Sequence, residues 1–171
     1  MDFPISFIPD NVIPCGPIYL SSAPASTQNP SLASWLEQGE GKTILINLGS
    51  AVTYDEFGTK QILGAVKEVL RKYPVQVLWK FNQREEWDVE SVFEGVKGEI
   101  KEGRLRLEKW LPIDPAAIME TGEVAISVHH GGANCFMEAV AYVLLSHVPP
   151  IYFPTSAFLL LTRAKAPEHH K

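Results

Sequence analysis

The stretch Val128-His-His-Gly-Gly-Ala-Asn-Cys-Phe-Met-Glu138 decides the fold. An apolar run from Val124 leads into two histidines and two glycines, and a helical pattern begins close behind them. Because glycine has no Cβ, the backbone at Gly131 and Gly132 can approach a bulky anion closely. A helix that follows would point free N–H groups and its positive dipole end at the same place. The stretch therefore predicts a strand, a glycine turn and a helix N-terminus that can bind phosphate.

Strands and helices alternate along the rest of the chain. Short apolar runs predict strands at 43–48, 75–81, 105–109, 124–128 and 150–153. Spacing and capping signals predict helices at 31–38, between a Thr53/Glu56 capping box and Pro74, over 86–101, after an Asp114 cap, and over 135–145. Such alternation implies crossover connections and a parallel sheet. We therefore predict an α/β fold, a Rossmann-like parallel sheet with helices on both faces.

The first 42 residues differ from the rest of the chain. They hold six prolines and a small polar run from Ser21 to Ser31. Proline fixes φ and removes a backbone donor, so this segment is predicted to be an extended linker with one short helix. We expect residues 43–154 to form the Rossmann-like domain. Residues 155–171 are expected to form a divergent C-terminal tail with an apolar run at Phe158.

Composition excludes several classes of protein. The 171 residues suit one domain, and 15 basic against 20 acidic side chains give a net charge of −5, which argues against a nucleic-acid partner. The two cysteines, Cys15 and Cys135, are too far apart for a disulfide framework and suit a reduced, cytoplasmic location. No signal peptide is visible, and the most apolar stretch is interrupted before it reaches the length of a membrane helix.

Candidate binding residues follow two of the predicted strands, at Gly49-Ser50 and at His129 to Asn134. The carboxyl ends of parallel strands share one edge of the sheet, where ligands bind. His130, and Asn134 as the helix cap, can donate hydrogen bonds to phosphate, and the Glu138 carboxylate can accept both hydroxyls of a ribose. A tight turn with a capping asparagine is the alternative. The histidines lack the spacing of metal ligands, so no metal site is predicted.

An ordered set of motifs resembles one enzyme family. The order His130-Gly-Gly-x-Asn-x-x-x-Glu138 resembles the donor-binding signature of the UDP-glycosyltransferases, which build two Rossmann-like domains in the GT-B fold. Pro14 to Ile18 resembles the segment between their domains, and Trp35-Leu36 a short helix before the first strand of the second domain. Asn47 to Ser50 and Trp110-Leu-Pro112 resemble two further motifs of that domain. The likeness spans about residues 9–154, the linker and most of a C-terminal donor-binding domain.

The resemblance implies a role for each candidate residue. Trp110 would stack on the uracil ring of a UDP-sugar, although an ordinary core tryptophan is the alternative. The diphosphate would be held by the turn and the helix start, at His130, Gly131, Gly132, Asn134 and Cys135. Gly49 and Ser50 would approach the phosphates or the sugar, with a simple polar turn as the alternative for Ser50. Glu138 would hold the ribose. No catalytic residue, metal or further cofactor is implied within this chain.

The chain also departs from the family pattern. A thiol at Cys135 replaces a serine hydroxyl and donates weakly, and Ile113 replaces a glutamine. No Asp-Gln pair follows Pro154, and the general base of the family lies in an acceptor domain that this sequence does not contain. The predicted function is the donor-binding domain of a hexosyltransferase. In the full architecture it would invert the anomeric carbon as the sugar moves to a hydroxyl of a lipid, sterol or secondary metabolite. The alternative is a non-catalytic module that binds nucleotide or self-associates through its apolar tail.

Overall fold

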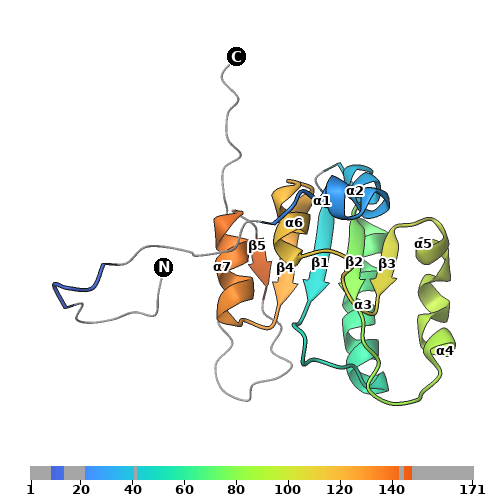
Figure 1. Ribbon diagram of the computed structural model, residues 1–171. Helices are drawn as coiled ribbons and strands as arrows, with labels where there is room; N and C mark the ends of the chain where they lie inside the picture. Colours follow the sequence, from blue (N-terminus) through green and yellow to red (C-terminus); the bar gives the residue numbers. More distant parts are fainter. Residues whose placement is uncertain (1–8, 14–21, 41, 143–144, 148–171) are drawn as a thin grey trace.

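A computed structural model describes residues 9–13, 22–40, 42–142 and 145–147. They form one parallel sheet in the order β3-β2-β1-β4-β5 (Figure 1). The strands are β1 (Thr43–Asn47), β2 (Gln76–Lys80), β3 (Leu105–Glu108), β4 (Val124–His129) and β5 (Leu145–His147). The parallel α/β sheet predicted from the sequence is confirmed.

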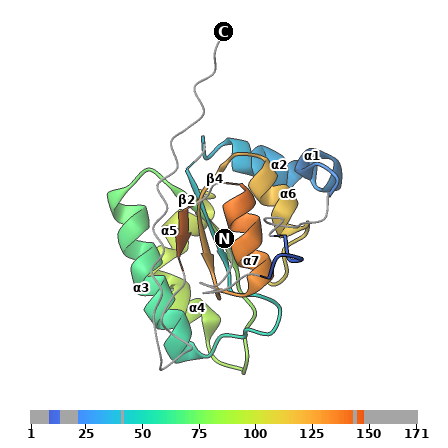
Figure 2. The ribbon, with the colours of Figure 1, turned by 90° about the vertical axis from the view of Figure 1, so that its left-hand side faces the viewer.

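Helices cover both faces of this sheet, as predicted. Figure 2 shows α3 (Glu56–Lys72), α4 (Val89–Phe93) and α5 (Lys97–Lys101) on one side. On the other side lie α1 (Ala25–Gln28), α2 (Pro30–Glu37), α6 (Pro115–Glu120) and α7 (Ala133–Ala141). The 3₁₀ turn η1 (Glu94–Val96) joins α4 to α5.

Alternation along the strands divides the core into two apolar layers. Leu78 belongs to the layer beneath α2 and α6, whereas its neighbour Trp79 belongs to the layer beneath α3 and α4. Successive side chains of a strand point to opposite faces, so one apolar run serves both layers. Leu32 and Leu36 of α2 are fully buried in the first layer, which places part of the predicted linker segment against the sheet. The predicted domain boundaries themselves stay a prediction.

Two predicted helices end or break differently in the structure. The helix predicted over 135–145 ends at Ala141, and Leu145 begins β5, where it pairs with Ile126. Periodicity alone does not separate helix from strand in so short an apolar run, and pairing with β4 decides it. The strand predicted at 150–153 lies outside the described residues. The surface helix predicted over 86–101 is divided into α4, η1 and α5, around Gly95 and Gly98, since glycine is a poor helix former.

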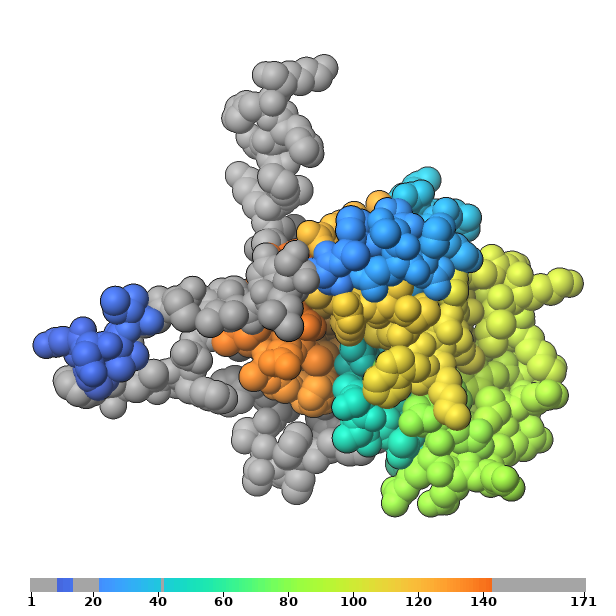
Figure 3. All heavy atoms as spheres, in the orientation of Figure 1, coloured from blue at the N-terminus to red at the C-terminus, as the bar shows by residue number. Residues whose placement is uncertain are grey.

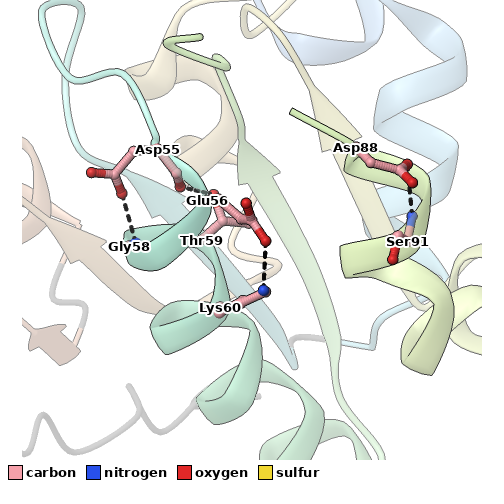
Figure 4. Close-up of polar contacts among 7 residues, drawn as sticks. All are labelled: Asp55, Glu56, Gly58, Thr59, Lys60, Asp88 and Ser91. Carbon is pink, nitrogen blue, oxygen red and sulfur yellow. Dashed lines mark hydrogen bonds and ion pairs between the residues drawn. The ribbon is translucent and has the colours of Figure 1, made fainter. Parts of the chain in front are cut away.

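The N-terminus of α3 is capped by a residue other than the predicted one. Asp55, rather than Thr53, is the N-cap, and its Oδ1 accepts the N–H of Gly58 at 2.7 Å (Figure 4). The Thr59 hydroxyl donates to the Asp55 carbonyl, and Glu56 pairs with Lys60 one turn along. Asp88 caps α4 in the same way through the N–H of Ser91. An aspartate directly before the helix satisfies an N–H that the helix itself leaves free.

We expect Asp55→Ala to lower the free energy of unfolding by about 1 kcal/mol, since the N–H of Gly58 loses its acceptor. Urea unfolding followed by circular dichroism measures the change. Asp88→Ala is the matched control, because it uncaps a helix of only five residues and should cost less. An Asp55→Ala protein as stable as the parent would contradict the assignment of this cap.

Among the helices that the structure describes, none is both long and apolar enough to cross a lipid bilayer.

Candidate functional site

The order of the strands reverses between β1 and β4. The chain runs from β1 to β2 on one side, and β4 then pairs with the opposite edge of β1. Open α/β sheets bind ligands beyond the carboxyl ends of the strands at such a switch point. The two glycine-containing turns predicted as binding segments leave the sheet here, because Asn47 and His129 are register partners at the ends of β1 and β4.

Both turns are closed by the last side chain of their strand. The Asn47 Oδ1 accepts the N–H of Gly49 at 3.2 Å, and the His129 Nδ1 accepts the N–H of Gly131 at 3.1 Å. Gly49 and Gly131 have φ values of 89° and 79°, in the region that favours glycine. His129 is buried, so of the two adjacent histidines it is the one that shapes the turn.

His130 is exposed, and its ring lies between two glycines. A Cβ on Gly49 would be 3.0 Å from His130 Cε1, and a Cβ on Gly132 would be 2.3 Å from His130 Nε2. The distance to the Gly132 Cβ is far shorter than any real contact. The imidazole can therefore occupy this position only because residue 132 has no Cβ. The two turns therefore meet at His130 and hold an imidazole at the edge of the sheet.

Helix α7 begins directly behind this imidazole. Its N-cap is Gly132, and the Phe136 N–H donates to the Gly132 carbonyl at 3.0 Å. The prediction that Asn134 caps the helix is wrong, because Asn134 is the second residue of the first turn and is exposed. A glycine in extended conformation ends the turn two residues earlier. The first N–H groups of α7 lack partners within the helix, as an anion site requires.

Cys135 and Glu138 lie on the first turns of α7. The Cys135 Sγ is 3.7 Å from His130 Nδ1. Burial, and secondarily Glu138, raises the pKa of the Cys135 thiol, so it is a neutral and weak donor. Burial, and secondarily Asp114, raises the pKa of the Glu138 carboxyl. Asp114 directly precedes α6, so its carboxylate lies close enough to act on the carboxyl of Glu138 within α7.

A cavity of about 530 Å³ opens in front of the switch point. It is lined by three of the predicted site residues, Gly49, Ser50 and Trp110, and by Gln28, Lys80 and Asp114 among others. Figure 3 shows the face on which α7, the segment after β1 and the segment after β3 meet.

Trp110 follows β3 and is 59% exposed. The alternative of an ordinary core tryptophan is therefore wrong. Ile113, three residues on, is buried in the apolar layer beneath α2 and α6 and offers the cavity no polar group. The Trp110 ring is held from one side by Lys80, whose Nζ lies 3.8 Å from the ring centroid. The cavity thus offers an exposed aromatic ring on one wall, and the two glycine turns lie next to it.

Comparison with known proteins places these features in one family. No family model matches the chain. Over 144 residues the chain is 41% identical to Glycosyltransferase sdnJ of Sordaria araneosa, a match that covers 81% of this chain and 28% of that protein. The chain belongs to the glycosyltransferases. It spans 28% of the length of this curated relative.

Solved structures of the family share the fold. A UGT transferase from Siraitia grosvenorii in complex with UDP superimposes with a TM-score of 0.61 and 17% identity, covering 80% of this chain and 31% of that one. UDP-glucose: anthocyanidin 3-O-glucosyltransferase, also in complex with UDP, gives a TM-score of 0.52 and 20% identity, over 82% of this chain and 29% of that one. The Rossmann-like half of a GT-B fold expected from the motifs is therefore the observed fold.

The sequence did not indicate three of the residues that line this cavity. Lys80 ends an apolar strand, Gln28 lies in the proline-rich segment, and Asp114 was predicted only as a helix cap. Asp114 makes no side-chain cap; it accepts the Ser22 hydroxyl at 2.6 Å. Gln28 also donates to Ser22, at 2.9 Å. A lone lysine at the carboxyl end of a strand was the one signal available for Lys80.

In the part of the chain that the structure describes, no cluster of three histidine, cysteine or acidic side chains could hold a metal ion. The cavity lining instead carries one cation, Lys80, and one carboxylate, Asp114. The described lining therefore presents an ammonium group, a carboxylate and an aromatic ring to a ligand.

The raised pKa of Glu138 predicts a pH dependence of stability. A carboxyl whose pKa is higher in the folded protein than in the unfolded chain disfavours folding once it is ionised. The loss of folding free energy is absent below the pKa that Glu138 has in the unfolded chain, near 4.5. It grows as the pH rises toward and through the higher pKa of Glu138 in the folded protein. We therefore expect Glu138→Gln to become more stable, relative to the parent, as the pH rises from 4 to 7.

Urea unfolding of the two proteins across this pH range measures the difference. Glu85→Gln, at an exposed glutamate, is the matched control and should show no such trend. A difference between Glu138→Gln and the parent that stays constant with pH would contradict the prediction.

Proposed function

We propose that this chain binds a UDP-sugar at the switch point of its sheet and forms the donor domain of a hexosyltransferase. The observation that carries the proposal is that Trp110 and the Gly49 turn line one cavity, while the imidazole of His130 lies against Gly49 and against Gly132, the N-cap of α7. An aromatic face suits a base, and a helix N-terminus with an adjacent imidazole suits a diphosphate. The relatives add support, since two solved neighbours are complexes with UDP.

In this proposal each site residue has one task. Trp110 stacks on uracil, and Glu138 accepts the hydroxyls of the ribose. The diphosphate binds at the first turn of α7, through His130, the backbone of Gly131 and Gly132, Asn134 and Cys135. Gly49 and Ser50 approach the phosphates or the sugar from the end of β1.

The chemistry proposed for the whole protein divides between two halves. A base outside this chain takes the proton of an acceptor hydroxyl, and the oxygen attacks the anomeric carbon and inverts it. The bond from that carbon to the diphosphate breaks, and UDP leaves with the electron pair. The α7 N-terminus and His130 stabilise the charge that develops on the leaving group. The acceptor is proposed to be a small molecule, because one solved neighbour is complexed with glycyrrhetinic acid 3-O-monoglucuronide.

Calorimetric titration with UDP and UDP-glucose tests the binding step. We expect both to bind the folded chain with dissociation constants between about 1 μM and 1 mM, which correspond to about 8 to 4 kcal/mol. GDP, with a base of different size, is the control and should bind more weakly. Absence of UDP binding at millimolar concentration, by protein that unfolds cooperatively, would overturn the proposal.

Location and self-association are two further expectations from the sequence. A cytoplasmic location, argued from the two distant cysteines, stays a prediction. The apolar tail predicted to drive self-association lies outside the described residues, and the comparisons favour the glycosyltransferase over the non-catalytic alternative.

A further inference from the structure

Lys80 brings three parts of the site together. It ends β2, and only 6% of the residue is exposed. Its Nζ donates to the Gly49 carbonyl at 2.7 Å and lies 3.8 Å from the centroid of the Trp110 ring. The same side chain lines the cavity. One ammonium group thus contacts the turn after β1 and the segment after β3.

Within the described part of the chain, this ammonium has no carboxylate partner. Among the ion pairs of the residues that the structure describes, none includes Lys80, although the surface lysines Lys60, Lys72 and Lys97 all have one. A buried charge without a counter-ion is costly, and burial lowers the pKa of Lys80 accordingly. An anion bound in the cavity would offset that cost.

The contacts of Lys80 leave some of its N–H donors available for a ligand. An ammonium group has three N–H donors, and one of them is directed at the Gly49 carbonyl. The contact with Trp110 is a cation–π interaction with the face of the ring. Among the described cavity-lining residues Lys80 is the only cation, whereas the nearby carboxylates, Asp114 and Glu138, repel phosphate.

We propose that Lys80 binds a phosphoryl oxygen of the nucleoside diphosphate and supplies the positive charge of the site. This rests on the proposed function, and it adds a residue that the family motifs of this chain did not include. In this role Lys80 keeps its hydrogen bond to the Gly49 carbonyl. A second N–H of the same ammonium group donates to the phosphate. Because Lys80 also contacts Trp110, one side chain links the residue that binds the base to the group that binds the phosphate.

A purely structural role is the competing explanation. A lysine that only positioned Trp110 would affect uridine and UDP equally, because both ligands use the tryptophan. A lysine that only held the Gly49 turn would affect UDP more than uridine but would leave the salt dependence of UDP binding unchanged. A lysine that binds phosphate affects UDP far more than uridine and also makes UDP binding more sensitive to salt. The ratio of the two affinities and the salt dependence together separate the explanations.

The experiment is calorimetric titration of uridine, UMP and UDP into the parent, Lys80→Met and Lys80→Arg. We expect Lys80→Met to weaken UDP binding about 10- to 100-fold and uridine binding less than about 3-fold, since one charged hydrogen bond is lost. Lys80→Arg should recover part of the loss, and the salt dependence of UDP binding should become shallower in Lys80→Met. Lys109→Met, at an exposed lysine beside Trp110 that does not line this cavity, is the matched control.

Equal losses for uridine and UDP, no loss for UDP, or a salt dependence of UDP binding that Lys80→Met leaves unchanged would overturn the proposal while leaving UDP binding by the parent intact. A parent protein that does not bind UDP would overturn the proposed function as well. Circular dichroism and urea unfolding establish that each variant folds. If Lys80→Met does not fold, Lys80→Gln, which keeps a donor for the Gly49 carbonyl but no charge, replaces it in the same comparison.

Discussion

Gly132→Ala is expected to leave the domain folded and to weaken UDP binding by about 100-fold. The new methyl carbon would lie 2.3 Å from His130 Nε2, so the imidazole must move. The ring is exposed and can rotate away, and Gly132 has a φ of −63°, which alanine adopts freely. Stability should therefore change by less than about 1 kcal/mol, whereas the anion loses a donor and meets a Cβ at the start of α7.

Two other glycines provide the comparison. Gly64, within α3, has open space around its added Cβ, so Gly64→Ala should bind UDP as the parent does and be slightly more stable. Gly49 has a φ of 89° and a Cβ contact of 3.0 Å to His130. Gly49→Ala should therefore lose both binding and about 1–2 kcal/mol of stability. Calorimetry and urea unfolding of the three variants measure these effects, and tight UDP binding by Gly132→Ala would contradict the placement of the diphosphate.

Trp110→Ala is expected to weaken both uridine and UDP binding by about 10- to 100-fold. Stacking of a base on an aromatic side chain contributes about 1–3 kcal/mol, and the loss should be the same for both ligands because only the base is affected. Since Trp110 is 59% exposed, the free energy of unfolding should change by less than about 1 kcal/mol.

The matched control is Phe57→Ala. Phe57 is also an exposed aromatic residue, at 74%, and it does not line the cavity. It should leave both affinities unchanged. A Trp110→Ala protein that loses UDP but keeps uridine would place the tryptophan at the phosphates instead of the base, and the orientation of the ligand proposed here would then be wrong.

The two effects differ in kind. Trp110→Ala lowers the affinity for every ligand that carries the base. Gly132→Ala and Lys80→Met lower the affinity mainly for ligands that carry the phosphates. Measured with uridine and UDP on the same set of variants, these losses divide the site into a base-binding part after β3 and a phosphate-binding part at the ends of β1, β2 and β4.

Local sequence was sufficient for the parts of this protein that depend on neighbouring residues. Alternating apolar runs predicted the parallel sheet, because a strand buried on both faces needs a continuous apolar run. The glycines around His130 predicted a turn and a helix start, because glycine lets the backbone approach a bound anion closely. The positions of Trp110 and of the Gly49 turn behind their strands were also predicted, since each follows a strand whose pattern is clear, whereas the exposure of Trp110 was not.

Tertiary structure decided what depends on contacts between distant residues. It divided the adjacent histidines, burying His129 in the turn and leaving His130 at the site, and it began α7 at Ala133 so that Asn134 is not its cap. It also brought Lys80 from the end of one strand to the Gly49 carbonyl 31 residues away. The sequence pattern around a single lysine at the end of a strand does not predict such a contact. Only the parallel packing of β1, β2 and β3 sets those strand ends side by side, and the charge of the site depends on that packing.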